Sequence, residues 1–384
     1  MSTDGITEAH INALVDELEK RDTWSITQTF LRLQTIPHQE RRSWRIIRET
    51  LLNMRKDVGL WPIFSPKLER FISDIYLFGT KRVFLLSDPS IDPMSLAEED
   101  PTKNSLLGFY DNEIFDRPRN HVGYHFKKWA IDDLEIYTFV TTRRAYENQT
   151  VPTEALDPKN QSKFDNSIIT ARIPKLVRTY DHVIKHADFS CLLIDQPGNL
   201  DRALVSTDAL RYEAQLHLQA TDKKRRPFVD LFPALKLLYL DFSDGIVNYI
   251  DSLSNESAAL RTKYNHNSAK DLRNHPVLVE ARIKNLQVDP FTLGLRWSVH
   301  SENPSIFLAG DKDMAEAATG QMFERRPLEF MTLPGHMSAL GFLHVINRIL
   351  HQLAEAQKST TAVVAANLAT ISSSESTTTD METL

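Results

Sequence analysis

Residues 277–299, VLVEARIKNLQVDPFTLGLRWSV, carry the strongest indication of the fold class. On both sides of Asp289-Pro290, apolar side chains alternate with polar ones. This period of two is typical of a half-buried strand, and two such runs around a proline-containing turn predict a β-hairpin. The apolar members are Val277, Val279, Ala281 and Ile283 in the first run, and Leu293, Leu295, Trp297 and Val299 in the second.

Helical patterns surround this hairpin. Upstream, the spacing predicts helices at 167–187, at 206–220 and over a long region from 229 to 263, which Pro233 or Gly245 could interrupt. An apolar run at 189–194 around Cys191 predicts a buried strand between the first two helices. Downstream, we expect a strand at 306–309 and a final amphipathic helix at 338–357.

The first 78 residues are typical of helices. Ile11, Leu14, Val15 and Leu18 follow the spacing of one buried helix face, and further helices are predicted at 40–57 and 66–78. The pattern then changes to short apolar runs, which predict strands at 83–86, 105–110 and 134–140.

The predicted fold is therefore α+β and helix-rich, with short strands in a first unit and a β-hairpin packed on helices in a second. We expect a helical region with a small β region at 1–150 and an α+β domain at 160–358. Pro152 and Pro158 favour a boundary within 147–165. From residue 359 the chain is rich in Ser, Thr and acids, which predicts a disordered tail at 359–384.

Composition excludes several classes of protein. The chain has 384 residues, 41% of them hydrophobic and 25% charged, so it can bury a core. One cysteine cannot form an internal disulfide, and neither glycine-rich nucleotide-binding motif is present. We see no signal peptide and no apolar run long enough to span a membrane, so we expect a cytoplasmic protein, or a nuclear one in a nucleated cell, with no membrane partner.

Two basic clusters suggest contact with a polyanion, although the formal net charge is −6. Arginines gather on one side of the second predicted helix, where guanidinium groups could bind phosphates in bidentate fashion. A solvated face paired with neighbouring acids is the alternative. Four adjacent cations before Pro227 predict an exposed loop that could contact phosphate or serve nuclear import. The residues are Arg41, Arg45, Arg48 and Arg55, and Lys223, Lys224, Arg225 and Arg226.

Acidic residues offer a catalytic alternative. On the long predicted helix, Asp241 and Asp244 could share a divalent metal, although they could equally form the wet face of that helix. Asp241 follows an apolar run, so we expect a shifted pKa there first. On the first strand of the predicted hairpin, Glu280 and Lys284 share a face, as in some nucleases and also in any exposed hairpin.

Histidines give a further metal candidate. His182 and His186 lie one turn apart on the predicted helix at 167–187, a spacing that can bind zinc. A capping or surface position near the helix C-terminus is the alternative.

These patterns lead to one functional hypothesis and two rivals. We expect a non-catalytic, nucleic-acid-associated or self-assembling structural protein, like a coat protein or nucleoprotein, which binds the RNA or DNA backbone without a cofactor and forms homo-oligomers. One rival is a metal-dependent nuclease or hydrolase that uses the carboxylates above. The other is a protein-interaction scaffold, which would expose a large apolar patch.

Overall fold

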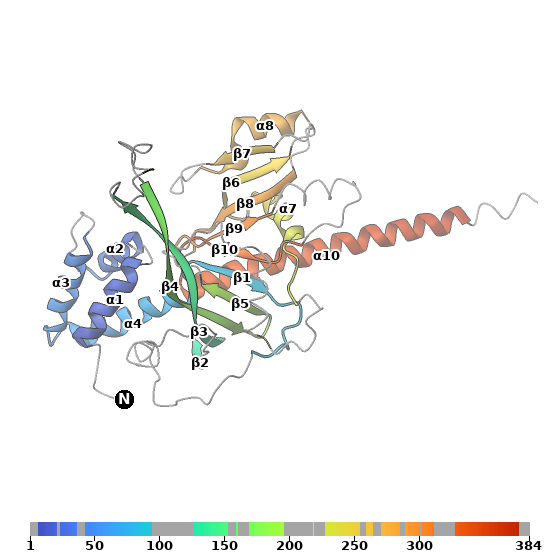
Figure 1. Ribbon diagram of the computed structural model, residues 1–384. Helices are drawn as coiled ribbons and strands as arrows, with labels where there is room; N and C mark the ends of the chain where they lie inside the picture. The colour runs from blue at the N-terminus through green and yellow to red at the C-terminus, as the bar shows by residue number, and fades with distance from the viewer. Residues whose placement is uncertain are drawn as a thin grey trace, which may run out of the picture. The chain divides into compact units, whose positions relative to one another are not determined.

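The structure of the chain is a computed structural model that divides into two compact units, Met1–Pro227 and Phe228–Leu384 (Figure 1). Each unit contains an antiparallel sheet and helices. The structure describes residues 7–20, 24–36, 43–93, 126–131, 133–152, 159, 169–195, 218, 227–253, 259–263, 270–284, 289–299, 302–310 and 327–375.

Unit 1 begins with helices whose apolar faces share one core. They are α1 (Glu8–Lys20), α2 (Trp24–Leu33), α3 (Trp44–Arg55) and α4 (Trp61–Phe78). The predicted buried face of α1 is confirmed, since Ile11, Leu14, Val15 and Leu18 are all buried. The predicted helices at 40–57 and 66–78 correspond to α3 and α4.

Helix α2, which the sequence did not predict, ends in an unusual cap. The N–H of Ile36 donates to the carbonyl of Leu31, and the N–H of Thr35 donates to the carbonyl of Arg32. This is the Schellman arrangement, in which the residue before the last donor takes a left-handed conformation. Thr35 does so, with φ +56°, where glycine is the usual residue.

The sheet of unit 1 has the order β2-β3-β4-β5-β1, and the neighbouring strands are antiparallel. The predicted strands at 83–86, 134–140 and around Cys191 are confirmed. The strands are β1 (Lys81–Leu85), β2 (Phe126–Ile131), β3 (Leu134–Val151), β4 (Ile169–Lys185) and β5 (Ser190–Asp195).

Strand β4 corrects the prediction of a helix at 167–187. This segment pairs with β3 from Val151↔Ile169 to Glu135↔Lys185. Pro174 within it would break a helix, and its many β-branched residues suit a pleated strand. Of the segment 147–165, where the sequence predicts a boundary, residues 147–151 belong to β3, and the part from 153 on lies outside the described residues apart from Lys159. The predicted elements at 105–110 and 206–220 lie outside the described residues, apart from Leu218.

The sheet of unit 2 has the order β10-β9-β8-β6-β7. Its strands are β6 (Ile246–Leu253), β7 (Ala259–Lys263), β8 (Asp289–Arg296), β9 (Ser305–Ala309) and β10 (Met331–Leu333). Its helices are α7 (Phe232–Leu240), the short 3₁₀-helix η4 (Leu272–Asn274), α8 (Pro276–Ile283) and α10 (Ala339–Glu375).

Only the second half of the predicted hairpin is a strand. The predicted first strand is α8, which Pro276 opens in the first helical turn, a position that suits proline. Its pattern of apolar residues was misleading, because Val277 and Ile283 are exposed and Leu278 is buried. Strand β8 pairs instead with β6 and β9, so the strand predicted at 306–309 is confirmed as its neighbour.

The long helix predicted from 229 to 263 is also wrong. Helix α7 ends at Leu240, and the chain turns at Gly245 before it continues as β6. Gly245 has φ +66°, and a Cβ there would lie 2.9 Å from Nε1 of Trp297. Only glycine suits both the conformation and the close approach.

The α+β class is confirmed, whereas the finer description is wrong. Besides short strands, unit 1 has the long paired strands β3 and β4 of 18 and 17 residues, and unit 2 has a sheet rather than a single hairpin. The predicted final helix at 338–357 is confirmed as part of α10. Helix α10 continues to Glu375, so it enters the segment 359–384, where composition predicts disorder. Residues 376–384 lie outside the described part of the chain. Within the described residues, no helix combines the length and the apolar character needed to cross a membrane.

Candidate functional site

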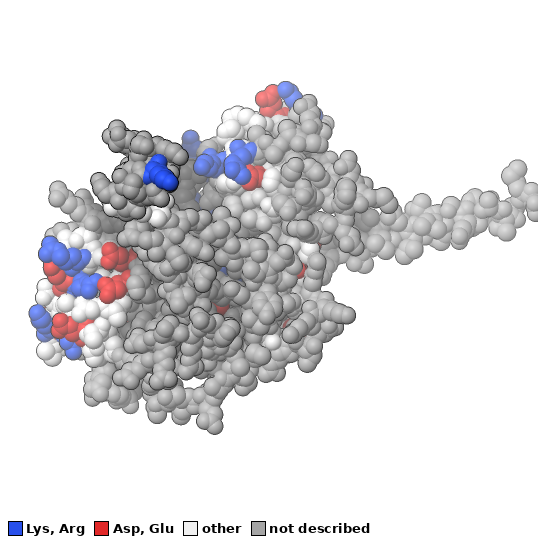
Figure 2. Space-filling model, in the orientation of Figure 1, with Lys and Arg blue, Asp and Glu red and all other residues white. Residues whose placement is uncertain are grey.

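The arginine face of α3 is paired with acids. Nη2 of Arg48 lies 2.6 Å from Oδ1 of Asp16 on α1, and Nη1 of Arg45 lies 3.3 Å from Oε1 of Glu49. Figure 2 shows Lys and Arg side chains mixed with Asp and Glu over this helical part of unit 1. Such a surface has less net attraction for phosphates than an unpaired row of guanidinium groups.

Of the other predicted phosphate contacts, the structure describes only Arg55. Arg55 lies on α3 and also has an interaction partner, whereas Arg41 and residues 223–226 lie outside the described residues. Contact between these cations and nucleic acid therefore stays a prediction.

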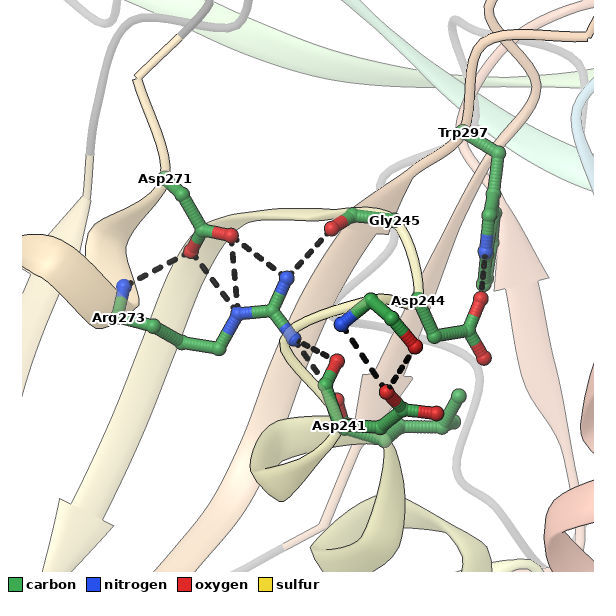
Figure 3. Close-up of polar contacts among 8 residues, drawn as sticks. Asp241, Asp244, Gly245, Asp271, Arg273 and Trp297 are labelled. Atoms are coloured by element: carbon green, nitrogen blue, oxygen red, sulfur yellow. Dashed lines mark hydrogen bonds and ion pairs between the residues drawn. The ribbon is translucent and has the colours of Figure 1, made fainter.

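The predicted acidic pair lies in the turn between α7 and β6, and not on a continuous helix (Figure 3). Oδ1 of Asp241 accepts hydrogen bonds from the N–H of Ser243 at 3.0 Å and from its hydroxyl at 2.6 Å. Nε2 of Gln352 donates to Oδ2 of Asp241 at 3.2 Å. The hydroxyl of Ser243, aided by Gln352 and Arg348, lowers the pKa of Asp241 although partial burial opposes this. The predicted pKa shift at Asp241 thus occurs, in the downward direction.

Asp244 is buried beside Asp241 and binds two other elements. Nε1 of Trp297, just after β8, donates to Oδ1 of Asp244 at 2.6 Å, and Nε of Arg348 on α10 donates to the same oxygen at 2.9 Å. Among the described residues, Oδ2 of Asp244 finds no hydrogen-bond partner. Desolvation and the charge of Arg348 lower the pKa of nearby His344, while the charge of Asp244 opposes that shift.

Arg273 stabilises the same turn from the other side (Figure 3). It is fully buried, and Nη2 lies 2.6 Å from Oδ2 of Asp271. Nε also donates to the carboxylate of Asp271, while Nη1 and Nη2 donate to the backbone carbonyls of Asp241 and Gly245 in the α7–β6 turn. This guanidinium therefore fixes η4 against the turn, a role for which its planar array of donors is well suited.

This polar network is suited to structure rather than to metal chemistry. The carboxylate of Asp241 accepts hydrogen bonds on both oxygens, and Asp244 is held by an indole and a guanidinium. Two-metal hydrolysis requires several carboxylates that are available as ligands, and of this pair only the buried Oδ2 of Asp244 has no partner among the described residues. Within the described part of the chain, no three His, Cys, Asp or Glu side chains come together to hold a metal ion.

The second catalytic candidate is also placed differently from the prediction. Glu280 and Lys284 were predicted on a strand, but Glu280 lies on α8 and Lys284 directly follows it. Nζ of Lys284 lies 2.6 Å from Oε1 of Glu280, and both side chains are well exposed. An exposed pair with i, i+4 spacing is typical of a helix surface.

The histidine pair does not form the predicted helical metal site, because His182 lies on β4. Its Nδ1 is 2.9 Å from the hydroxyl oxygen of Thr138, and its Nε2 is 3.1 Å from the carbonyl oxygen of Tyr76. Both ring nitrogens are thus used within the core. His186 follows the strand and stacks on Phe189.

A buried ion pair in unit 1 was not predicted. Lys81 on β1 and Asp195 on β5 are register partners, and Nζ lies 2.9 Å from Oδ1 with both side chains fully buried. Nζ also donates to the carbonyl of Tyr180 at 2.7 Å, and Oδ2 accepts from the N–H of Tyr180 at 3.0 Å. Such a saturated pair fixes the register of three strands. Only Asp195 is indicated by a sequence signal, because it directly follows the apolar run 191–194.

An apolar groove lies on the helices of unit 1. Its volume is about 390 Å³, and Met54, Leu60, Ile63 and Phe64 line it together with polar residues that include Thr35 and Lys67. Leu60 and Ile63 are 56% and 65% exposed. The groove therefore presents apolar side chains to solvent at the left-handed cap of α2.

The sheet of unit 2 has one apolar face and one mixed face. Helix α7 packs against β8, and the strand residues on one side of the sheet are buried: Val247, Ile250, Leu293, Leu295, Ile306 and Leu308. The intervening residues project from the opposite side, because successive side chains of a strand alternate between faces. We call this side the outer face; Tyr249, Arg261, Lys263, Gly294 and Phe307 define it.

Two aromatic rings meet at the centre of the outer face. Tyr249 on β6 is the register partner of Gly294 on β8, and Gly294 is in turn the partner of Phe307 on β9. The rings of Tyr249 and Phe307 are T-shaped, with centroids 5.0 Å apart. A Cβ on Gly294 would lie 2.8 Å from Cβ of Tyr249, so the absence of a side chain lets the rings close over the middle strand. Both rings are partly exposed.

Cations lie beside these rings on β7. Arg261 and Lys263 are both exposed, and they are register partners of Asp251 and Tyr249. The guanidinium of Arg261 lies 6.0 Å from the centroid of Tyr249 and forms two hydrogen bonds with the carboxylate of Asp251. Arg296 on β8 also belongs to this side of the sheet. The sequence did not predict this arrangement.

Comparison with protein-family models and with curated proteins finds no match for this chain.

Proposed function

We propose that the chain is a non-catalytic, nucleic-acid-associated structural protein that contacts the phosphate backbone through the outer face of the unit 2 sheet. The proposal rests on Arg261 and Lys263, which lie two residues apart on β7 and have exposed side chains. They lie beside two partly exposed rings, those of Tyr249 and Phe307. Cations supply the salt-dependent attraction to phosphates, and aromatic rings offer contact with bases.

The charges on the outer face support a polyanion as the partner. Lys263 is an exposed cation on this face beside Tyr249, whereas the guanidinium of Arg261 binds the buried carboxylate of Asp251 and Arg296 has an interaction partner of its own. On the face of α3, Arg45 and Arg48 are bound by acids, as Arg261 is on the sheet. What favours the sheet for the phosphate contact is Lys263 beside two partly exposed aromatic rings, an arrangement that could also hold the bases.

The test is fluorescence anisotropy with a labelled RNA of about 12 nucleotides, within the site sizes known for stacking platforms. Lys263→Glu is expected to lower the affinity about 3- to 10-fold at low salt and to reduce the salt slope by about one. Lys358→Glu is the matched control, because Lys358 is an exposed lysine on α10 and not on the sheet. Equal binding by wild type and Lys263→Glu at every salt concentration would refute the proposal.

Self-assembly belongs to the same proposal and has its own measurement. Light scattering of the purified chain, combined with the ratio of absorbance at 260 and 280 nm, reports the mass of the particle and any nucleic acid that co-purifies. A structural protein on nucleic acid is expected to elute above the monomer mass of 44.0 kDa with a raised absorbance ratio. A nucleic-acid-free monomer that fails to bind the labelled RNA would contradict this role.

A further inference from the structure

We infer that the outer face of the unit 2 sheet selects single-stranded over double-stranded nucleic acid, because bases stack on Tyr249 and Phe307. This inference rests on the proposed function and adds the class of ligand. It follows from the aromatic pair at the centre of the face, whereas the proposed function follows from the cations at its edge.

The rings are held in a fixed arrangement. Gly294 removes the side chain that would separate them, and the hydroxyl of Tyr249 donates to Oδ2 of Asp251 at 3.0 Å. Asp251 in turn binds Arg261. A ring that is already oriented loses little conformational freedom when a base stacks on it.

Spacing along the face suits a nucleic-acid strand. Lys263 lies directly opposite Tyr249 on the neighbouring strand, and Arg261 lies two residues away on the same side. Neighbouring strands are about 4.8 Å apart, so a base on the Tyr249 ring places its phosphate within reach of these long side chains. Bases in a duplex are already stacked on one another and are not free to do this.

The variant that tests the inference is Phe307→Leu, which removes the aromatic ring and retains an apolar side chain. Its matched control is Phe71→Leu, which replaces a partly buried ring that stacks on Phe30 in unit 1. The probes are a single-stranded oligonucleotide of about 12 nucleotides and a duplex of the same sequence, both titrated into the full chain. Phe307→Tyr keeps a ring and serves as the rescue variant if the leucine variant unfolds.

Phe307→Leu is expected to weaken single-strand binding about 5- to 100-fold, while duplex binding stays within about 2-fold of wild type. Phe71→Leu and Phe307→Tyr are expected to bind the single strand like wild type. If Phe307→Leu binds the single strand as well as Phe71→Leu does, or weakens both probes equally, the inference is overturned. In either case, a loss of binding in Lys263→Glu still supports the proposed function, so the two failures can be told apart.

Discussion

Asp241 illustrates how a neighbouring residue decides the chemistry of a side chain. The apolar run before it suggests a carboxylate with a pKa raised by burial. Instead, Ser243, two residues further on, donates twice to this carboxylate and lowers its pKa. An Asp followed by Ser at this spacing is a turn signal, and the prediction of a long helix concealed it.

The lowered pKa of Asp241 predicts a specific pH dependence of stability. Because the folded pKa lies below the unfolded value, the carboxylate contributes stability above about pH 4, and this contribution is lost as the pH falls through the folded pKa. Asp241→Asn is expected to lower the stability at neutral pH and to flatten the acid side of the pH profile. Urea unfolding midpoints measured from about pH 6 to pH 2 test this.

The control for this profile is Glu280→Gln, which removes one exposed carboxylate from α8. It is expected to unfold in parallel with wild type at each pH. If Asp241→Asn and wild type lose stability at the same rate as the pH falls, the assignment of acid sensitivity to Asp241 is wrong.

At the scale of elements, segments with one uniform pattern of apolar residues were predicted well. Helix α1 and strands β1, β5 and β9 have one dominant pattern of apolar residues, and the structure confirms it. Helix α8 was missed because a short run of alternating residues fits a strand and a helix surface about equally. Strand β4 was missed because its partner β3 stabilises it, and pairing between distant segments is not visible in a local pattern.

The guanidinium of Arg273 links η4 to the α7–β6 turn, and no local sequence pattern indicates this link. Arg273→Ala would leave Asp271 without its partner and would free the carbonyls of the α7–β6 turn. We expect a loss of about 3–5 kcal/mol in the free energy of unfolding, because an ion pair with a buried member is broken on one side. Chemical denaturation followed by circular dichroism measures this loss.

Arg45→Ala is the matched control, since Arg45 is an exposed arginine whose pair with Glu49 is also exposed. This variant is expected to lower the free energy of unfolding by no more than about 0.5 kcal/mol. A comparable loss for both variants would show that Arg273 does not fix the turn.

At the scale of the whole molecule, the candidate site could not be predicted from the sequence. Tyr249, Gly294 and Phe307 lie far apart along the chain, and only strand register makes them neighbours. The basic clusters were visible because their members are close in sequence. Local charge patterns therefore indicated a polyanion, whereas the position of the candidate surface required the order of the strands.

The division of the chain after Pro227 gives a whole-molecule prediction. Residues 223–226 are four adjacent cations close to this boundary, and the sequence predicts that they form an exposed loop. Brief trypsin treatment is expected to cleave first after Lys223, Lys224 or Arg225, since Pro227 protects the bond after Arg226. Mass spectrometry should then find two lasting fragments, one from each unit, because compact units resist proteolysis longer than the segments between them. The control carries Lys223→Gln, Lys224→Gln and Arg225→Gln, and it should lose this first cleavage while later cleavages remain. Early cleavage within β3, β4 or β8 would show that the units are not the stable parts of the chain.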